Sequence, residues 1–131
     1  MKAATVLLRQ VHPTWMQDGV ATSLAFKPSK KDSGVLSTYN GSKIDAAAAW
    51  RHYTTKMGFG SHGVVGVSVS ECEECELKVI ADGIPYEEHV GIDFNAHGSS
   101  RREKIAKKLQ ASVASHADGT LSRAFLARAF F

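Results

Sequence analysis

The sequence predicts an α+β fold, with a single mixed or antiparallel sheet and two long helices packed on one face. Segments with the alternation of a strand occur on both sides of a segment with helical spacing, so strands and helices do not alternate regularly along the chain. The two long segments with helical spacing, 42–56 and 100–117, are too few to cover both faces of a parallel sheet. These observations favour a sheet that is at least partly antiparallel.

The chain is expected to form one domain over residues 1–119. Its length of 131 residues is common for a single domain, and a hydrophobic fraction of 44% with a charged fraction of 22% is typical of globular proteins. Residues 120–131 carry a dense apolar load, which predicts a helical tail that docks on the domain or on a partner.

The first segments along the chain read as strands. Residues 4–11 (ATVLLRQV) are rich in β-forming residues and end before Pro13, which pushes the preceding residue toward extended geometry. Residues 22–26 (TSLAF) show a short alternation and predict a second strand. A loop then leads to a third candidate strand.

This third strand is followed by the first helix. In residues 34–41 (GVLSTYNG), alternation places Val35, Ser37 and Tyr39 on one face, and the final Asn-Gly pair predicts a turn. Within residues 42–56 the apolar positions recur with helical spacing and alanine is abundant, which predicts a helix that ends at the following glycines.

The second half of the domain reads as strands, a short acidic helical turn and the last helix. Residues 63–70 have the composition of a buried strand, residues 77–82 predict a short strand or extended connection, and residues 89–94 alternate clearly. The stripe that marks the last helix, 100–117, consists of Ile105, Leu109 and Val113.

Both cysteines of the chain lie in an acidic stretch, SECEECELKV, at residues 70–79. Ser70 and Glu73 match the spacing of a capping box, which predicts one or two helical turns there. Cys72 and Cys75 supply only half of a zinc site, and the surrounding glutamates oppose formation of a redox-active thiolate. We therefore expect two buried structural cysteines, no metal site and no cofactor.

The charge and the N-terminus bear on location and partners. The net charge of +3 allows an acidic partner without requiring one. The first apolar stretch is interrupted by Arg9, no apolar run approaches the length of a membrane span, and the two cysteines close only a trivial loop. These features predict a cytoplasmic protein without a membrane partner.

Two groups of residues suggest binding functions. Basic residues on the last helix could contact phosphates, which predicts weak, non-specific nucleic-acid binding or simply a solvated face. These residues are Arg101, Arg102, Lys104, Lys107 and Lys108. Apolar residues of the tail predict an interaction surface, within the chain, with a protein partner or in a homo-oligomer. These residues are Leu121, Phe125, Leu126, Phe130 and Phe131.

A third group suggests catalysis. If a pocket joined them, a histidine could act as general base for a serine. The residues of this group are His12, Trp15, Ser23, Ser37, His52 and His89. No GxSxG, HExxH, P-loop or GxGxxG motif accompanies them, so no catalytic residue is identified from the sequence.

The sequence therefore gives a ranking of functions. The first hypothesis is a small cytoplasmic protein-interaction or regulatory module without catalysis. The alternatives are nucleic-acid binding through the last helix, and a small hydrolase or transferase that uses His12, His52 or His89.

Overall fold

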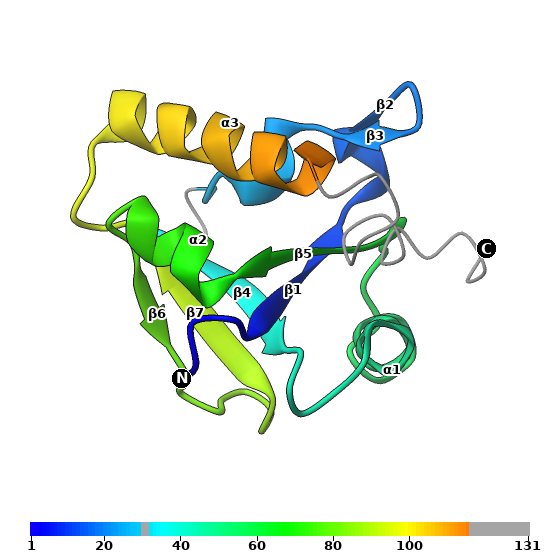
Figure 1. The fold of residues 1–131 in the computed structure, drawn as a ribbon. Coiled ribbons are helices and arrows are strands. Elements are labelled where there is room, and N and C mark those ends of the chain that lie inside the picture. Colours follow the sequence, from blue (N-terminus) through cyan, green and yellow to red (C-terminus); the bar gives the residue numbers. More distant parts are fainter. Residues whose placement is uncertain (30–31, 116–131) are drawn as a thin grey trace.

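The computed structural model describes residues 1–29 and 32–115. The strands are β1 (Val6–Val11), β2 (Met16–Gln17), β3 (Val20–Ala21), β4 (Val35–Asn40), β5 (Gly63–Ser68), β6 (Lys78–Ile80) and β7 (His89–Asp93). The helices are the short η1 (Pro13–Trp15) and η2 (Ser23–Phe26), α1 (Ala46–Arg51) with its extension η4 (His52–Lys56), α2 (Val69–Glu74) and α3 (Ser99–Ser115). Figure 1 shows their arrangement.

Five strands form one antiparallel sheet in the order β5-β1-β4-β7-β6, and β2 and β3 form a separate hairpin. Because β1 lies between β4 and β5, strands that are distant in the sequence are neighbours in the sheet. The predicted α+β class with an antiparallel sheet is thereby confirmed. Among the described residues, no helix combines the length and the apolar composition that a bilayer crossing requires.

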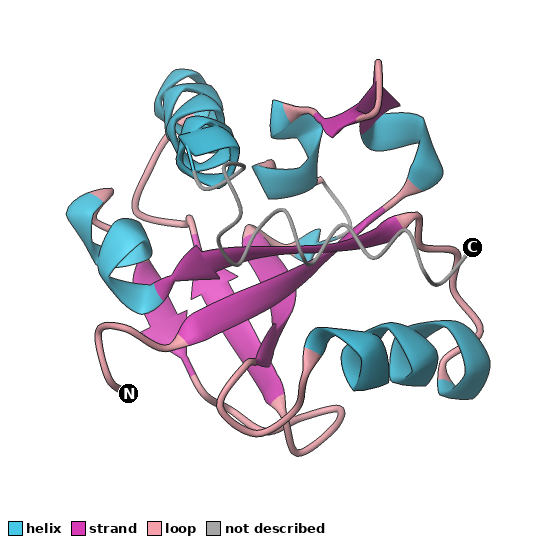
Figure 2. Ribbon diagram, turned by 45° about the vertical axis from the view of Figure 1, so that its right-hand side comes forward, coloured by secondary structure: helices cyan, strands magenta, loops and turns pink. Residues whose placement is uncertain are grey.

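The two faces of the sheet carry separate apolar clusters. On one face, Leu7 belongs to a cluster that includes Ile105 and Leu109 of α3, and on the other face the adjacent Leu8 packs in a cluster with Ala49 of α1. Figure 2 shows α3 and α1 on opposite sides of the sheet. The expected placement of both long helices on one face is thus corrected, because β1 is apolar on both of its faces and each face needs a cover.

The helix between β4 and β5 is shorter than expected and changes its geometry. Asp45 accepts a hydrogen bond from the backbone N–H of Ala48 at 2.8 Å, and this N-cap starts α1 at Ala46. The helix widens into one π turn over His52–Lys56, where Thr54 Oγ1 donates to the carbonyl oxygen of Trp50 at 2.8 Å. The π turn contains His52, whose Nδ1 lies 2.7 Å from Oη of Tyr39 on β4.

The acidic helical turn exists, but its cap lies two residues earlier than predicted. Ser68, not Ser70, is the N-cap of α2 and exchanges reciprocal hydrogen bonds with Glu71. Ser68 and Glu71 are three residues apart, as are Ser70 and Glu73, so the spacing alone does not distinguish the two possible caps. The end of β5 does, because its pairing with β1 continues through Ser68 and ends there.

Residues 22–26 do not form the predicted strand. They contain the short helix η2, in which the adjacent residues Ala25 and Phe26 are both buried. Adjacent burial is incompatible with the alternating faces of a strand and suits a turn that packs under α3. The short alternation of the sequence therefore gave the wrong element here.

Candidate active site

The candidate site lies where β1 and β4 separate. These strands pair only through Leu7 with Asn40 and Leu8 with Tyr39, whereas β1 continues along β5 and β4 continues along β7. The guanidinium of Arg9 lies beyond the last pair and donates from Nη1 to the carbonyl oxygen of Ser37 at 3.0 Å. A side chain thus replaces a ladder hydrogen bond at this point of the sheet.

A cleft of about 450 Å³ opens at this separation. Its size is within the range of small-molecule sites. Polar residues of the sheet, aromatic residues of the flanking segments and the η2–β4 loop line it. The lining residues are Arg9, Gln10, His12, Trp15, Ser29, Asp32, Ser37, Tyr39, Tyr53, Met57, Phe59, Gly60, Pro85, Tyr86 and His89.

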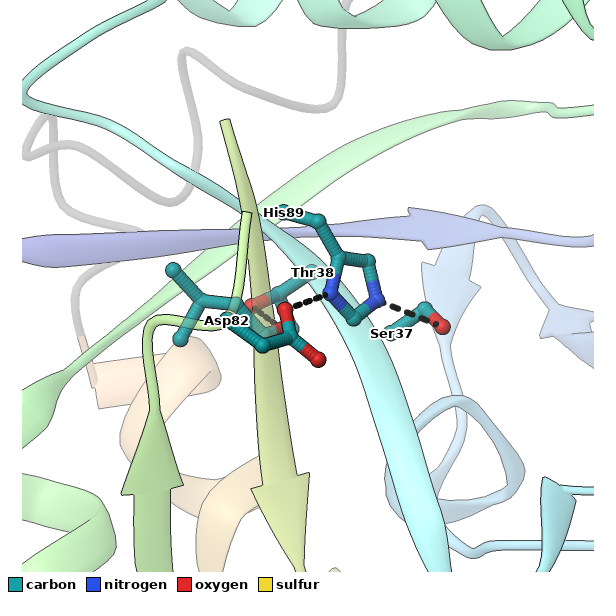
Figure 3. A network of polar contacts seen from close by, with 5 residues as sticks. Ser37, Thr38, Asp82 and His89 are labelled. Atoms are coloured by element: carbon teal, nitrogen blue, oxygen red, sulfur yellow. Dashed lines mark hydrogen bonds and ion pairs between the residues drawn. The ribbon is translucent and has the colours of Figure 1, made fainter. Parts of the chain in front are cut away.

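A chain of two hydrogen bonds crosses one side of this cleft (Figure 3). His89 Nδ1 lies 2.6 Å from Asp82 Oδ1, and His89 Nε2 lies 3.1 Å from Ser37 Oγ. His89 is 6% exposed, whereas Ser37 is exposed. The arrangement is a serine, a histidine and an aspartate linked in sequence, with the serine hydroxyl on the open side.

Backbone geometry places each of these three side chains. Alternation turns Ser37 of β4 and His89 of β7 to the same face, while Val90 belongs to the core on the other face. In the β6–β7 loop, the N–H of Gly83, which has a φ of 65°, donates to the carbonyl oxygen of His89 at 3.2 Å. This contact holds the adjacent Asp82 beside the imidazole.

A glycine lies next to both the serine and the histidine on this face of the sheet. Gly91 is paired with Ser37 in the sheet register and follows His89 on the same face of β7. A Cβ at Gly91 would lie 2.8 Å from Cγ1 of Val35 and 4.0 Å from Cε1 of His89. The absence of a side chain therefore avoids a collision with Val35 on β4, whereas the distance to the imidazole is that of an ordinary contact.

The hydrogen bonds define the chemistry that the three groups can perform. Partial desolvation opposes the charged carboxylate of Asp82, but the hydrogen bond and charge of His89 outweigh it and lower the pKa of Asp82. An ionised carboxylate accepts the proton on Nδ1, so the neutral imidazole presents an unprotonated Nε2 to Ser37. In this tautomer His89 can accept the hydroxyl proton of Ser37.

A second polar pair borders the same cleft. Tyr39 Oη lies 2.7 Å from His52 Nδ1, and the Tyr39 ring stacks on Tyr86 with centroids 4.5 Å apart. Burial raises the pKa of Tyr39 to about 12 and also raises the pKa values of Tyr53 and Tyr86. These phenols remain protonated near neutral pH and act as hydrogen-bonding and stacking groups rather than as bases.

The structure brings together only part of the histidine and serine group suggested by the sequence. Ser37 and His89 form a direct hydrogen bond, and His12 and Trp15 line the same cleft. His52 does not line the cleft but holds Tyr39, which does. Ser23 belongs to η2 and is not among the lining residues.

Sequence reasoning missed Asp82 and Arg9. Asp82 precedes Gly83 in the loop before Pro85, and a carboxylate seven residues before a histidine has no motif that would connect the two. Arg9 interrupts an apolar strand, and a charge at an inner strand position was the available signal for a functional residue.

The cysteines belong to a different part of the molecule. Cys72 is fully buried and Cys75 is 3% exposed, and both belong to the cluster on the α3 face. Burial, together with the charge of Cys75 and nearby glutamates, raises the pKa of Cys72 to about 12. The thiol is therefore protonated at neutral pH. Among the described residues, no group of three or more potential ligands for a metal ion is assembled.

The predicted phosphate contacts on α3 stand apart from the cleft, since none of them lines it. Arg101, Lys104, Lys107 and Lys108 are exposed. Arg102 is partly buried and donates from Nε to the carbonyl oxygen of His97 at 2.8 Å.

The predicted interaction tail lies outside the residues that the structure describes, as do Leu121, Phe125, Leu126, Phe130 and Phe131. Tail docking and nucleic-acid binding both stay predictions. No known protein family, curated protein or solved structure matches the chain.

Proposed function

We propose that the protein is a small hydrolase or transferase in which Ser37 is the nucleophile, His89 the general base and acid, and Asp82 the residue that orients His89. The observation that carries this proposal is the pair of hydrogen bonds, 2.6 Å and 3.1 Å long, that links Asp82 to His89 and His89 to Ser37 beside a cleft. The proposal advances the catalytic alternative over the interaction module that the sequence ranked first.

The geometry supports acyl transfer in two steps. Ser37 Oγ attacks the carbonyl carbon of an ester, its proton passes to His89 Nε2, and the carbonyl electron pair moves to the oxygen. When this pair returns, the bond to the leaving alcohol breaks and His89 gives its proton to the alcohol. Water then attacks the acylated Ser37 in the same manner, which releases the acid and restores the serine hydroxyl. An alcohol or amine in place of water makes the reaction a transfer.

Asp82 and Arg9 have different roles in this scheme. Asp82 bonds to the imidazole of His89 and acts on Ser37 only through it, so it is a positioning residue, and its charge stabilises the imidazolium that forms in each step. Arg9 brings a positive charge to the same cleft, where it can bind a negatively charged group of the substrate.

Hydrolysis of short-chain 4-nitrophenyl esters tests the proposal. Ser37→Ala should lower kcat/KM by about 100-fold or more, because the nucleophile and its proton are removed together. Ser29→Ala is the matched control, since Ser29 lines the same cleft but bonds to Asp32 instead of a histidine. Equal rates in wild type and Ser37→Ala would reject the nucleophile assignment.

Other proposals carried from the sequence have their own supports. Docking of residues 120–131 on a partner or a second copy is supported by their apolar composition, and a cytoplasmic location by the two free cysteines. Weak nucleic-acid binding is supported by the exposed basic residues of α3. None of these bears on the serine chemistry of the cleft.

A further inference from the structure

We propose that the ligand of the cleft is a small molecule that carries an anionic group, phosphate or carboxylate, on a planar ring, with the anionic group bound by Arg9. This inference names the substrate class of the proposed function. It rests on the proposed function in one respect, which is that the molecule bound in the cleft is taken to be the substrate. Its physical basis is an incompletely compensated cation next to a set of aromatic side chains.

The cation is the guanidinium of Arg9. It is partly buried, and burial lowers its pKa because the charged form is incompletely solvated. Nε donates to the carbonyl oxygen of Ala25 at 2.7 Å and Nη1 donates to that of Ser37 at 3.0 Å. Within residues 1–29 and 32–115, no carboxylate lies at ion-pair distance from it.

These contacts leave part of the guanidinium available. A guanidinium has five N–H donors, and the carbonyl oxygens that Arg9 contacts are neutral. Its planar fork matches the oxygen atoms of a phosphate or carboxylate, and such charge-assisted hydrogen bonds are stronger than neutral ones. An anion in the cleft would therefore supply the negative charge that the protein itself does not place on Arg9.

The aromatic side chains determine the rest of the ligand. Arg9 lies over the ring of Trp15 at 5.3 Å, and the rings of Tyr53 and Phe59 are 5.2 Å apart in the same lining. Phe59 is 51% exposed although it is a large apolar side chain. A planar ring stacked on these residues would cover this surface and gain the energy of aromatic contacts.

One acidic residue in the lining opposes the anion. The carboxylate of Asp32 is close enough to raise the pKa of Arg9, but it accepts hydrogen bonds from Ser29 N at 2.7 Å and Ser29 Oγ at 2.8 Å. Asp32 thus offsets the charge of Arg9 only from a distance. Its removal should strengthen anion binding, and this sign distinguishes a ligand anion from a ligand cation.

Calorimetric titration of the full chain with four probes tests the inference: adenosine 5′-monophosphate, adenosine, benzoate and inorganic phosphate. Adenosine monophosphate, benzoate or both should bind at least about 10-fold more tightly than adenosine and inorganic phosphate. The two ring-bearing anions separate a phosphate preference from a carboxylate preference. No saturable binding of either of them would overturn the inference.

Three variants assign the anion to Arg9. Arg9→Gln should lower the affinity for the preferred anion by about 10-fold or more and leave the affinity for adenosine unchanged within about twofold. Arg102→Gln is the matched control, since Arg102 also donates its Nε to a backbone carbonyl, but on α3. If Arg9→Gln does not fold, Asp32→Asn tests the same assignment, and it should raise the affinity for the anion by about two- to fivefold. Unchanged or weaker binding in Asp32→Asn contradicts the assignment.

Ser37→Ala separates this inference from the proposed function. It should retain the anion affinity of the wild type, because Arg9 contacts the backbone carbonyl of residue 37 and not its side chain. Ester hydrolysis that depends on Ser37 without binding of any ring-bearing anion overturns the ligand class alone. Anion binding together with hydrolysis that is unaffected by Ser37→Ala overturns the nucleophile alone.

Discussion

Asp82 and His89 are joined by a 2.6 Å contact between Oδ1 and Nδ1 across the β6–β7 loop. The contact fixes which imidazole nitrogen carries the proton, because an ionised carboxylate can only accept. It leaves Nε2 as an acceptor for the hydroxyl of Ser37, 3.1 Å away. The orientation of one ring thus decides whether the serine can be activated.

Asp82→Asn should abolish the preference of His89 for the tautomer with the proton on Nδ1, while leaving the fold intact. The amide can donate to Nδ1, which favours the tautomer with the proton on Nε2, where it no longer accepts from Ser37. We expect kcat/KM for ester hydrolysis to fall by about 100-fold or more with little change in melting temperature, since the Asp82 side chain is 35% exposed. Asp93→Asn on β7 is the control, and an equal loss there would reject the positioning role.

Much of the fold can be predicted from the sequence because it follows from local periodicity. Alternation over residues 35–40 correctly places Ser37 and Tyr39 on one face, and helical spacing correctly identifies the buried stripe that includes Ile105 and Leu109. Residues 22–26 failed because a five-residue alternation is too short to separate a strand from a helical turn. Local patterns therefore identified the longer elements correctly, but not the type of the shortest one.

The candidate site is harder to predict from the sequence because it depends on contacts across the sheet. Ser37 and His89 are 52 residues apart, and they meet only because β4 pairs with β7. Arg9 reaches Ser37 because β1 and β4 part after two pairs, a feature without a local sequence signal. The candidate histidines could be named, but their partners could not be chosen before strand order was known.

The tyrosines should titrate abnormally. The pKa of Tyr39 is raised from 10.0 to about 12, so this group contributes stability in full below pH 10 that is lost as the pH rises through about 12. The pKa values of Tyr53 and Tyr86, the other two tyrosines, are raised as well. Ultraviolet absorbance should show little tyrosinate at pH 10 in the folded protein. Half ionisation at that pH, with the fold intact, would contradict the burial of these phenols.

The cysteines should be unreactive in the folded protein. Cys72 is fully buried and its pKa is raised to about 12, so the nucleophilic thiolate is scarce at neutral pH. We expect alkylation by iodoacetamide at pH 8 to require unfolding, and to proceed fully in denaturant. Rapid labelling of Cys72 without denaturant would revive a redox or metal-binding hypothesis for the acidic stretch.

Gly91→Ala should destabilise the protein. The added methyl group would approach Cγ1 of Val35 to 2.8 Å, so a strand side chain has to move. Such overpacking costs about 1–3 kcal/mol in unfolding free energy. Gly98→Ala is the control, because its Cβ would meet nothing within 4 Å, and chemical denaturation compares the two. An unfolding free energy that is unchanged in Gly91→Ala would show that Val35 on β4 can move without cost, and would contradict the prediction.

Covalent labelling of Ser37 tests the central claim most directly. A fluorophosphonate reacts with a serine whose hydroxyl is deprotonated by a neighbouring histidine, and mass spectrometry of the digested protein locates the adduct. The account predicts an adduct on Ser37 that is absent in His89→Ala, with Ser29 in the same cleft unmodified. Failure to label Ser37 in the folded wild-type protein, or equal labelling of Ser29, would contradict it.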